Sequence, residues 1–179
     1  MTALIAALFV AVMVAANLLI AALGPWATPF VAFVFVGLSM VSRDYLHDGW
    51  RHRGGFVVRM GGIIVLAGVL AWAINPAAGR VAVASAAALV VSAAAETLVF
   101  DRLYDRPWLV RSNGSNLPGA LVDSVVFIGV AFGLSWAVVG VMAAQTAAKL
   151  AGGVVWSLVA RSTINPDRRR AQRRLATAN

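Results

Sequence analysis

The chain contains no cysteine, only two histidines and few charged residues. Without cysteine it can form no disulfide, thiolate metal site or cysteine nucleophile. Two histidines are too few for a typical zinc site. Charged residues make up 12% of its 179 residues, whereas a soluble domain of this size carries about a quarter. Because 61% of the residues are hydrophobic, the composition indicates an integral membrane protein.

Six apolar segments are candidates for membrane helices, since a spanning helix needs about 20 mostly apolar residues. Turn-forming or polar stretches separate them, and the long apolar run 117–160 divides near "GLSW", residues 133–136. The expected helices are 2–23, 30–42 with an extension into "RDYL", 56–74, 81–100, and one helix on each side of the "GLSW" break within 117–160. We therefore expect an all-α fold, a bundle of six transmembrane helices.

Positive charge is distributed unevenly between the two ends of these helices. Thirteen arginines lie between helices two and three, between helices four and five, or in the C-terminal tail, and only Arg80 lies on the opposite side. Cytoplasmic segments of membrane proteins carry the excess of arginine and lysine. Both termini are therefore expected in the cytoplasm, with the protein in the cell inner (plasma) membrane.

The chain divides into an expected transmembrane transporter domain, residues 1–161, and a basic cytoplasmic tail, residues 162–179. The net charge of +8 would suit nucleic acid, but the charges cluster beside apolar segments, as membrane topology requires. We expect the tail to contact anionic lipid of the bilayer, with no nucleic acid as partner. A scaffold that uses this tail to hold a cytosolic protein or RNA is the alternative.

Three charged residues interrupt the apolar helices: Glu96, Asp123 and Lys149. A charge at the centre of a membrane helix costs about 2.5–3.5 kcal/mol on insertion scales, and such groups usually mark substrate or ion pathways. If the fifth helix enters the membrane at Pro118, Asp123 lies roughly 8 Å inside. We expect the three residues to meet in one half of the bundle. A purely structural ion-pair network is the alternative.

Several uncharged polar residues also lie in or beside the helices. Asn17 and Gln145 are inside apolar segments, and Ser115 and Asn116 are expected where the fifth helix begins. An interhelical hydrogen bond would explain Asn17 as well as a ligand contact does.

The segment that carries His47 and His52, with Asp44 and Asp48, is expected to be a solvated loop. Its acidic residues and the two histidines could imitate a metal cluster, but a wet loop explains them better. No metal-ligand spacing, nucleotide-binding loop or Ser–His–Asp arrangement is apparent in the sequence. We therefore expect no metal, no cofactor and no enzymatic activity.

The second half of the chain resembles a known family. The stretch "ETLVFDRLYDRPWLVRSNGSNLPGALVDSVVFIGVAFG", followed by "AAKLAGGVVW", is similar to the queuosine precursor transporter family, also called the vitamin uptake transporter (VUT) family. The likeness extends to the first-helix Asn17 and to Asp44 at the end of helix two. The positions that match the family's signature are Ser115, Gly119, Asp123, Ser124, Phe127, Ala131, Phe132 and Lys149.

This resemblance implies import of a small purine-like substrate, a 7-deazaguanine such as preQ0 or preQ1, by alternating access around a polar intramembrane site. A carboxylate, Asp123 or Glu96, would accept the ring N–H and the exocyclic amine of the guanine-like edge, with Lys149 holding Asp123 in place. An amide would read the carbonyl and an aromatic ring would stack on the base. The expected substrate-binding residues are Asp123, Glu96, Lys149, Asn17, Asn116, Ser115, Phe127 and Phe132.

A substrate-capture subunit of a larger energised vitamin importer would have the same size and helix count. It would be inactive alone and would copurify with partner proteins. The sequence leaves the energy source and the oligomeric state open.

Overall fold

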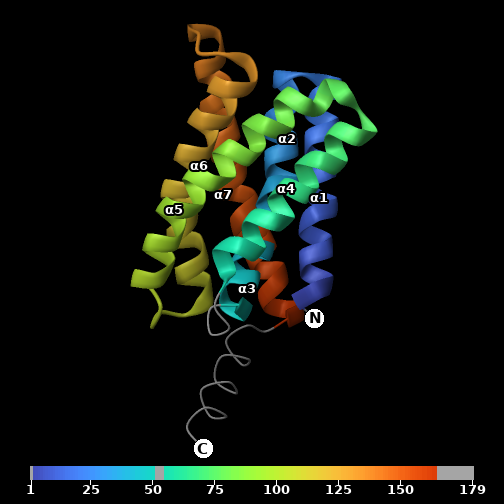
Figure 1. Ribbon diagram of the computed structural model, residues 1–179. Coiled ribbons are helices and arrows are strands. Elements are labelled where there is room, and N and C mark those ends of the chain that lie inside the picture. The colour runs from blue at the N-terminus through green and yellow to red at the C-terminus, as the bar shows by residue number, and fades with distance from the viewer. Residues whose placement is uncertain (1, 51–54, 165–179) are drawn as a thin grey trace, which may run out of the picture.

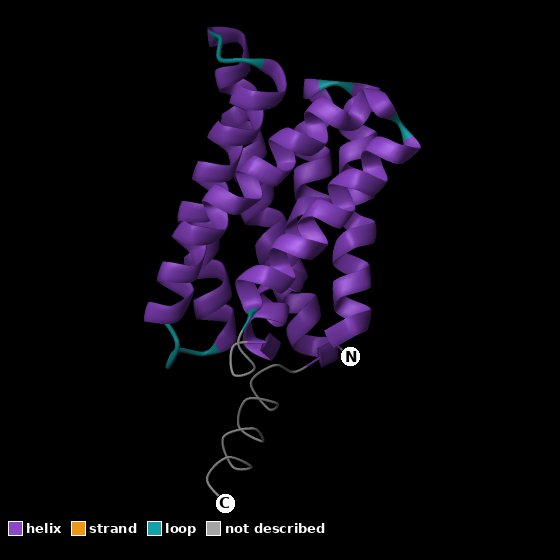
Figure 2. Ribbon diagram, in the orientation of Figure 1, coloured by secondary structure: helices purple, strands orange, loops and turns teal. Residues whose placement is uncertain are grey.

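The computed structural model describes residues 2–50 and 55–164, and every regular element in these ranges is helical (Figure 2). His52 and residues 165–179 of the basic tail therefore lie outside the described residues. The α-helices are α1 (Thr2–Leu23), α2 (Thr28–Val31), α3 (Gly37–Trp50), α4 (Phe56–Ile74), α5 (Gly79–Arg102), α6 (Trp108–Phe132) and α7 (Trp136–Ile164). A π-helical segment, Ala32–Val36, joins α2 to α3, and short 3₁₀ turns, Pro25–Ala27 and Pro76–Ala78, follow α1 and α4.

Five rods among the described residues are long and apolar enough to cross a membrane: Thr2–Leu23, Pro25–Trp50, Pro76–Arg102, Trp108–Phe132 and Trp136–Thr163. A shorter apolar helix, Val58–Ile74, lies between the second and third of them. The all-α expectation is confirmed, and the chain is a multi-pass membrane protein. The count of six spans and the cytoplasmic position of both termini stay predictions.

The predicted bounds hold where the sequence is uniformly apolar. Helices α1 and α4 match the expected segments, and the break near residues 133–136 is present. The predicted start of the fifth helix was wrong, because α6 begins at Trp108 and contains Pro118 in its interior. Membrane helices tolerate such a proline, since neighbouring groups satisfy the carbonyl that it leaves unpaired.

Apolar side chains cover the outside of the bundle and polar side chains lie within it, as a bilayer requires. Large exposed apolar residues occur on every long helix; they include Leu4, Leu8, Phe30, Val65, Leu66, Val90, Leu98, Leu121, Val125, Val154 and Leu158. Several buried residues are polar or charged, among them Arg43, Arg111 and Lys149. Because polar residues lie inside and apolar residues outside, a functional site is expected in the interior of the bundle.

Two glycines let α7 cross the second rod at backbone contact. A Cβ on Gly152 would overlap the carbonyl oxygen of Phe33, and a Cβ on Gly37 would lie 2.7 Å from the carbonyl carbon of Gly152. The crossing falls at the π-helical segment, where the widened turn changes the course of the rod. The second rod is therefore seated against α7 at its middle, and α3 continues from that point to one end of the bundle.

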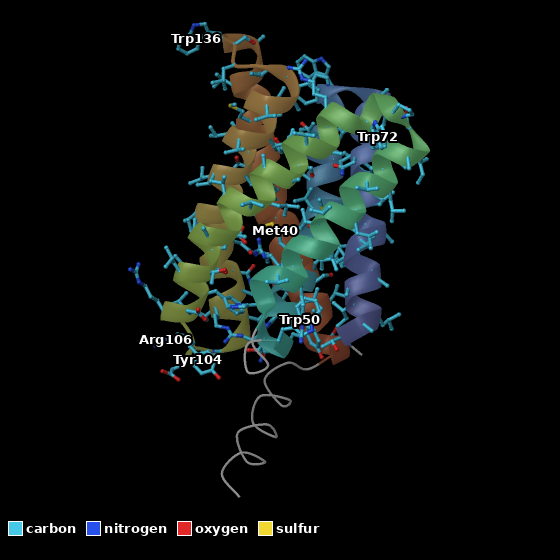
Figure 3. The ribbon with its side chains drawn as sticks, in the orientation of Figure 1. Met40, Trp50, Trp72, Tyr104, Arg106 and Trp136 are labelled. Carbon is cyan, nitrogen blue, oxygen red and sulfur yellow. The ribbon has the colours of Figure 1, made fainter. Side chains whose placement is uncertain are left out.

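The two ends of the bundle differ in character (Figure 3). Trp72 and Trp136 lie at one end, and Trp136 is 93% exposed, as expected of a residue at a membrane interface. Trp50, Tyr104 and Arg106 lie at the other end. The first turn of α1 and the last turn of α7 share this second end (Figure 1).

Candidate functional site

Asp123 of α6, which is partly buried, and Lys149 of α7, which is fully buried, form an ion pair inside the bundle. Lys149 is 1% exposed; its Nζ contacts Asp123 Oδ2 and donates a hydrogen bond to Ser124 Oγ at 3.1 Å. The expected contact between Asp123 and Lys149 is present. The expected depth of Asp123 below the membrane surface stays a prediction. Asp123 lies fifteen residues, about 22 Å, past Trp108, so it sits deep in the bundle.

A small cavity adjoins Asp123. It is lined by α1, the π-helical segment, α5, α6 and α7, through Met13, Ala16, Asn17, Ile20, Val36, Ser85, Leu89, Asp123, Phe127 and Gln145. The cavity measures about 20 Å³, which is room for about one water molecule. Four polar side chains converge on it from four helices: Asn17, Ser85, Asp123 and Gln145.

Gln145 and Ser85 belong to this cavity although neither was expected in the site. Gln145 is 2% exposed, and among the described residues its Oε1 has no hydrogen-bond partner. It lies one helical turn before Lys149, on the same side of α7. The signal in the sequence was a polar residue in an apolar helix, four positions from the buried lysine.

Glu96 was expected to meet Asp123 and Lys149, but it does not contact this pair. It is 3% exposed and forms an ion pair with Arg43 of α3 through Oε2, and it is not among the residues that line the cavity. Arg43 also lies 3.4 Å from Asp44 Oδ1 and close enough to Asp123 for electrostatic attraction. Arg43 therefore lies near the carboxylates of both ion pairs.

The predicted solvated loop around Asp44, His47 and Asp48 was wrong, because these residues belong to the end of α3, and the expected extension of the second helix through residues 43–46 is confirmed. Asp44 Oδ2 accepts a hydrogen bond of 2.5 Å from Ser112 Oγ, and Asp48 Oδ1 lies 2.8 Å from Arg111 NH2. Arg111 is fully buried, with its guanidinium 3.8 Å from the centre of the Phe100 ring. The helix continues because its charged residues meet partners on α5 and α6 instead of water.

The same explanation applies to His47, which belongs to α3 and is 8% exposed, with its ring 5.1 Å from that of Phe100. His52, the other histidine of the supposed loop, lies outside the described residues.

Of the first-helix and aromatic candidates Asn17, Phe127 and Phe132, two line the cavity and one does not. Asn17 and Phe127 line it. Phe132 lies behind Phe127 in an edge-to-face contact, with ring centres 6.1 Å apart, and does not line the cavity.

Ser115 and Asn116 lie on α6 two turns before Asp123, outside the cavity. Ser115 donates a hydrogen bond of 3.0 Å to the carbonyl of Ser112 in its own helix. Asn116 is 1% exposed and packs beside Gly153, where a Cβ would lie 2.8 Å from its Nδ2. Within the described ranges, neither amide atom of Asn116 has a hydrogen-bond partner.

Comparison with known proteins gives one family. The family model described as "Putative vitamin uptake transporter" matches residues 1–161, which include the cavity, the ion pairs described above and almost all of α7. No curated protein and no solved structure matches the chain. A transporter family implies movement of a ligand and no catalysis. The chain belongs to the vitamin uptake transporter family.

Proposed function

We propose that the protein imports a queuosine precursor, a 7-deazaguanine such as preQ0 or preQ1, across the inner membrane. The observation that carries the proposal is the partly buried carboxylate of Asp123, which contacts Lys149 and also lines a cavity between five helical segments. Buried charges inside membrane bundles usually belong to substrate or ion pathways. The queuosine-type substrate is supported by the resemblance around Asp123 and Lys149.

The chemistry of the cavity suits a flat base with adjacent N–H donors. A carboxylate can accept a ring N–H and an exocyclic amine together, and charge-assisted hydrogen bonds of this kind are stronger than neutral ones. Lys149 holds the Asp123 carboxylate in position while the ligand is absent. Phe127 offers an aromatic face to the base, and Asn17 offers an amide to its carbonyl.

Transport requires the cavity to change size, because about 20 Å³ is far below the roughly 300–1,000 Å³ of typical ligand pockets. Alternating access would open it to one side at a time. The ion pairs Arg43–Glu96 and Asp48–Arg111 hold α3 against α5 and α6 at the end that we assign to the cytoplasm. In our proposal, α3 moves away from these helices when the cavity opens inward, and the π-helical segment before it serves as the hinge.

The test is a rescue assay. The chain is expressed in bacteria that lack both queuosine-precursor synthesis and their own importer, a limiting 7-deazaguanine is supplied, and queuosine in tRNA is measured. Wild type should restore queuosine and Asp123→Asn should not, at equal membrane levels. Asp105→Asn, the same change at an exposed turn, is the matched control and should rescue fully. If a correctly inserted wild type gives no rescue, the proposed substrate is wrong and a capture subunit that needs partners becomes the better hypothesis.

A further inference from the structure

Gln145 is the one cavity-lining residue whose buried side-chain oxygen lacks a hydrogen-bond partner within the described residues. Hydroxyl groups of α7 are satisfied locally: Thr146 Oγ1 donates to the carbonyl of Met142 at 2.9 Å, and Ser157 Oγ donates to that of Val154 at 2.8 Å. Buried polar groups nearly always have partners, so an unpaired carbonyl that lines a cavity points to an external donor.

The position of Gln145 shows where the external hydrogen-bond donor would lie, namely beside Asp123. Asp123 and Gln145 reach the same cavity from α6 and α7, and Lys149, one turn beyond Gln145, is already engaged by Asp123 and Ser124. A ligand bound to Asp123 therefore lies within the small space that Gln145 also lines. Gln145 carries no charge, so it selects by hydrogen bonding and shape.

We propose that Gln145 is a specificity-determining residue whose amide oxygen accepts the pyrrole N–H of the 7-deazaguanine. This inference rests on the proposed function. When Asp123 takes the ring N–H and the amine on one edge of the base, the pyrrole N–H is the ring donor left on the other edge. The site then takes the free base and rejects ligands that lack this N–H, because they leave the Gln145 oxygen buried and unpaired.

The test is an uptake cycle with two proteins and two ligands. Gln145→Met keeps the length of the side chain and removes its oxygen. The second ligand is the furo analogue of the substrate, in which an oxygen atom replaces the pyrrole N–H without changing the shape of the ring. Wild type should take up the parent base with a KM about tenfold below that for the furo analogue, a typical effect of one buried hydrogen bond.

In Gln145→Met, the KM for the parent should rise about tenfold and the preference over the furo analogue should disappear. Thr146→Val is the matched control, because the Thr146 hydroxyl is satisfied within its own helix; its KM and preference should equal those of wild type. A preference that persists in Gln145→Met would overturn the assignment of Gln145. Uptake by wild type would still support the proposed function.

A stability measurement separates ligand reading from packing. Ligand-free Gln145→Met in detergent should melt at or above the wild-type temperature, since it loses an unsatisfied buried oxygen, while the stabilisation by added base should shrink. A lower melting temperature with an unchanged KM would assign Gln145 to packing and overturn the proposal. Absence of uptake by wild type itself would reject the proposed function and this inference together.

Discussion

Gly119 of α6 lies directly against the side chain of Glu96 of α5, so closely that a Cβ at Gly119 would overlap the Glu96 carboxylate. Glu96 extends past this glycine to pair with Arg43 of α3. Gly119 is therefore needed for this ion pair although it carries no charge. Its missing side chain leaves the space through which the Glu96 carboxylate reaches the Arg43 guanidinium.

Gly119→Ala should displace Glu96 and leave Arg43 without its main partner. Breaking a buried ion pair costs about 3–5 kcal/mol, so we expect a large drop in the thermal unfolding midpoint in detergent and less protein in the membrane. Gly140→Ala on α7 is the matched control, because no atom lies within 4 Å of its would-be Cβ. It should be neutral or slightly stabilising, since alanine favours a helix over glycine by about 1 kcal/mol. Equal melting of the two variants would contradict this account of Gly119.

Replacing both Asp123 and Lys149 should restore stability that a single replacement loses, but it should not restore transport. Asp123→Asn leaves the buried Lys149 ammonium without its carboxylate and should lose about 3–5 kcal/mol, whereas Lys149→Met leaves the partly buried Asp123 carboxylate and should lose less. The double variant removes both charges and should recover much of that loss in a thermal unfolding assay. It should still fail in the rescue assay, because the substrate-reading carboxylate is gone. A double variant that is both stable and active would show that the pair serves packing alone.

The sequence was sufficient for features that depend on composition along one helix. Helices α1 and α4 are unbroken apolar runs, and their predicted bounds agree with the structure. The Asp123–Lys149 contact could be expected because two opposite charges inside apolar helices have few other ways to be satisfied.

Other features depend on neighbours that no local pattern identifies. The start of α6 was misplaced because Arg111 and Ser112 look like loop residues until Asp48 and Asp44 of α3 are seen to meet them. The role of Gln145 required its position in space, since its amide differs from a satisfied one only by what surrounds it.

The membrane orientation can be tested with single cysteines, because the chain contains none of its own. Ser135→Cys and Ser162→Cys make the same small change at exposed positions, one just before α7 and one in its last turns. If the arginine-rich end is cytoplasmic, a membrane-impermeant maleimide added to intact cells should label Ser135→Cys only. Ser162→Cys should react after the cells are permeabilised. The reverse pattern would place the arginine-rich end of the bundle, which carries the first turn of α1 and the last turn of α7, outside the cell.

The proposed movement of α3 predicts a change in access to α6. Ser115 lies one turn beyond Ser112 and is fully buried, so Ser115→Cys should react slowly with a small permeant thiol reagent. Adding Asp48→Asn removes the charge that Arg111 holds at 2.8 Å, while Arg111 can still stack on Phe100. A charge-assisted hydrogen bond contributes about 1.5–3 kcal/mol, so the reaction should speed up at least about tenfold.

Two controls decide what such acceleration means. Asp105→Asn in the same Ser115→Cys background changes an exposed carboxylate and should leave the rate unchanged. Ser162→Cys reports general exposure and should react equally fast with or without Asp48→Asn. If Asp48→Asn accelerates only Ser115→Cys, α3 opens away from α6 as a unit, because loosening one ion pair near its end exposes a residue deeper in the bundle. An unchanged rate would mean that the inward opening uses a different helix, and the Asp48–Arg111 pair would then be assigned to stability.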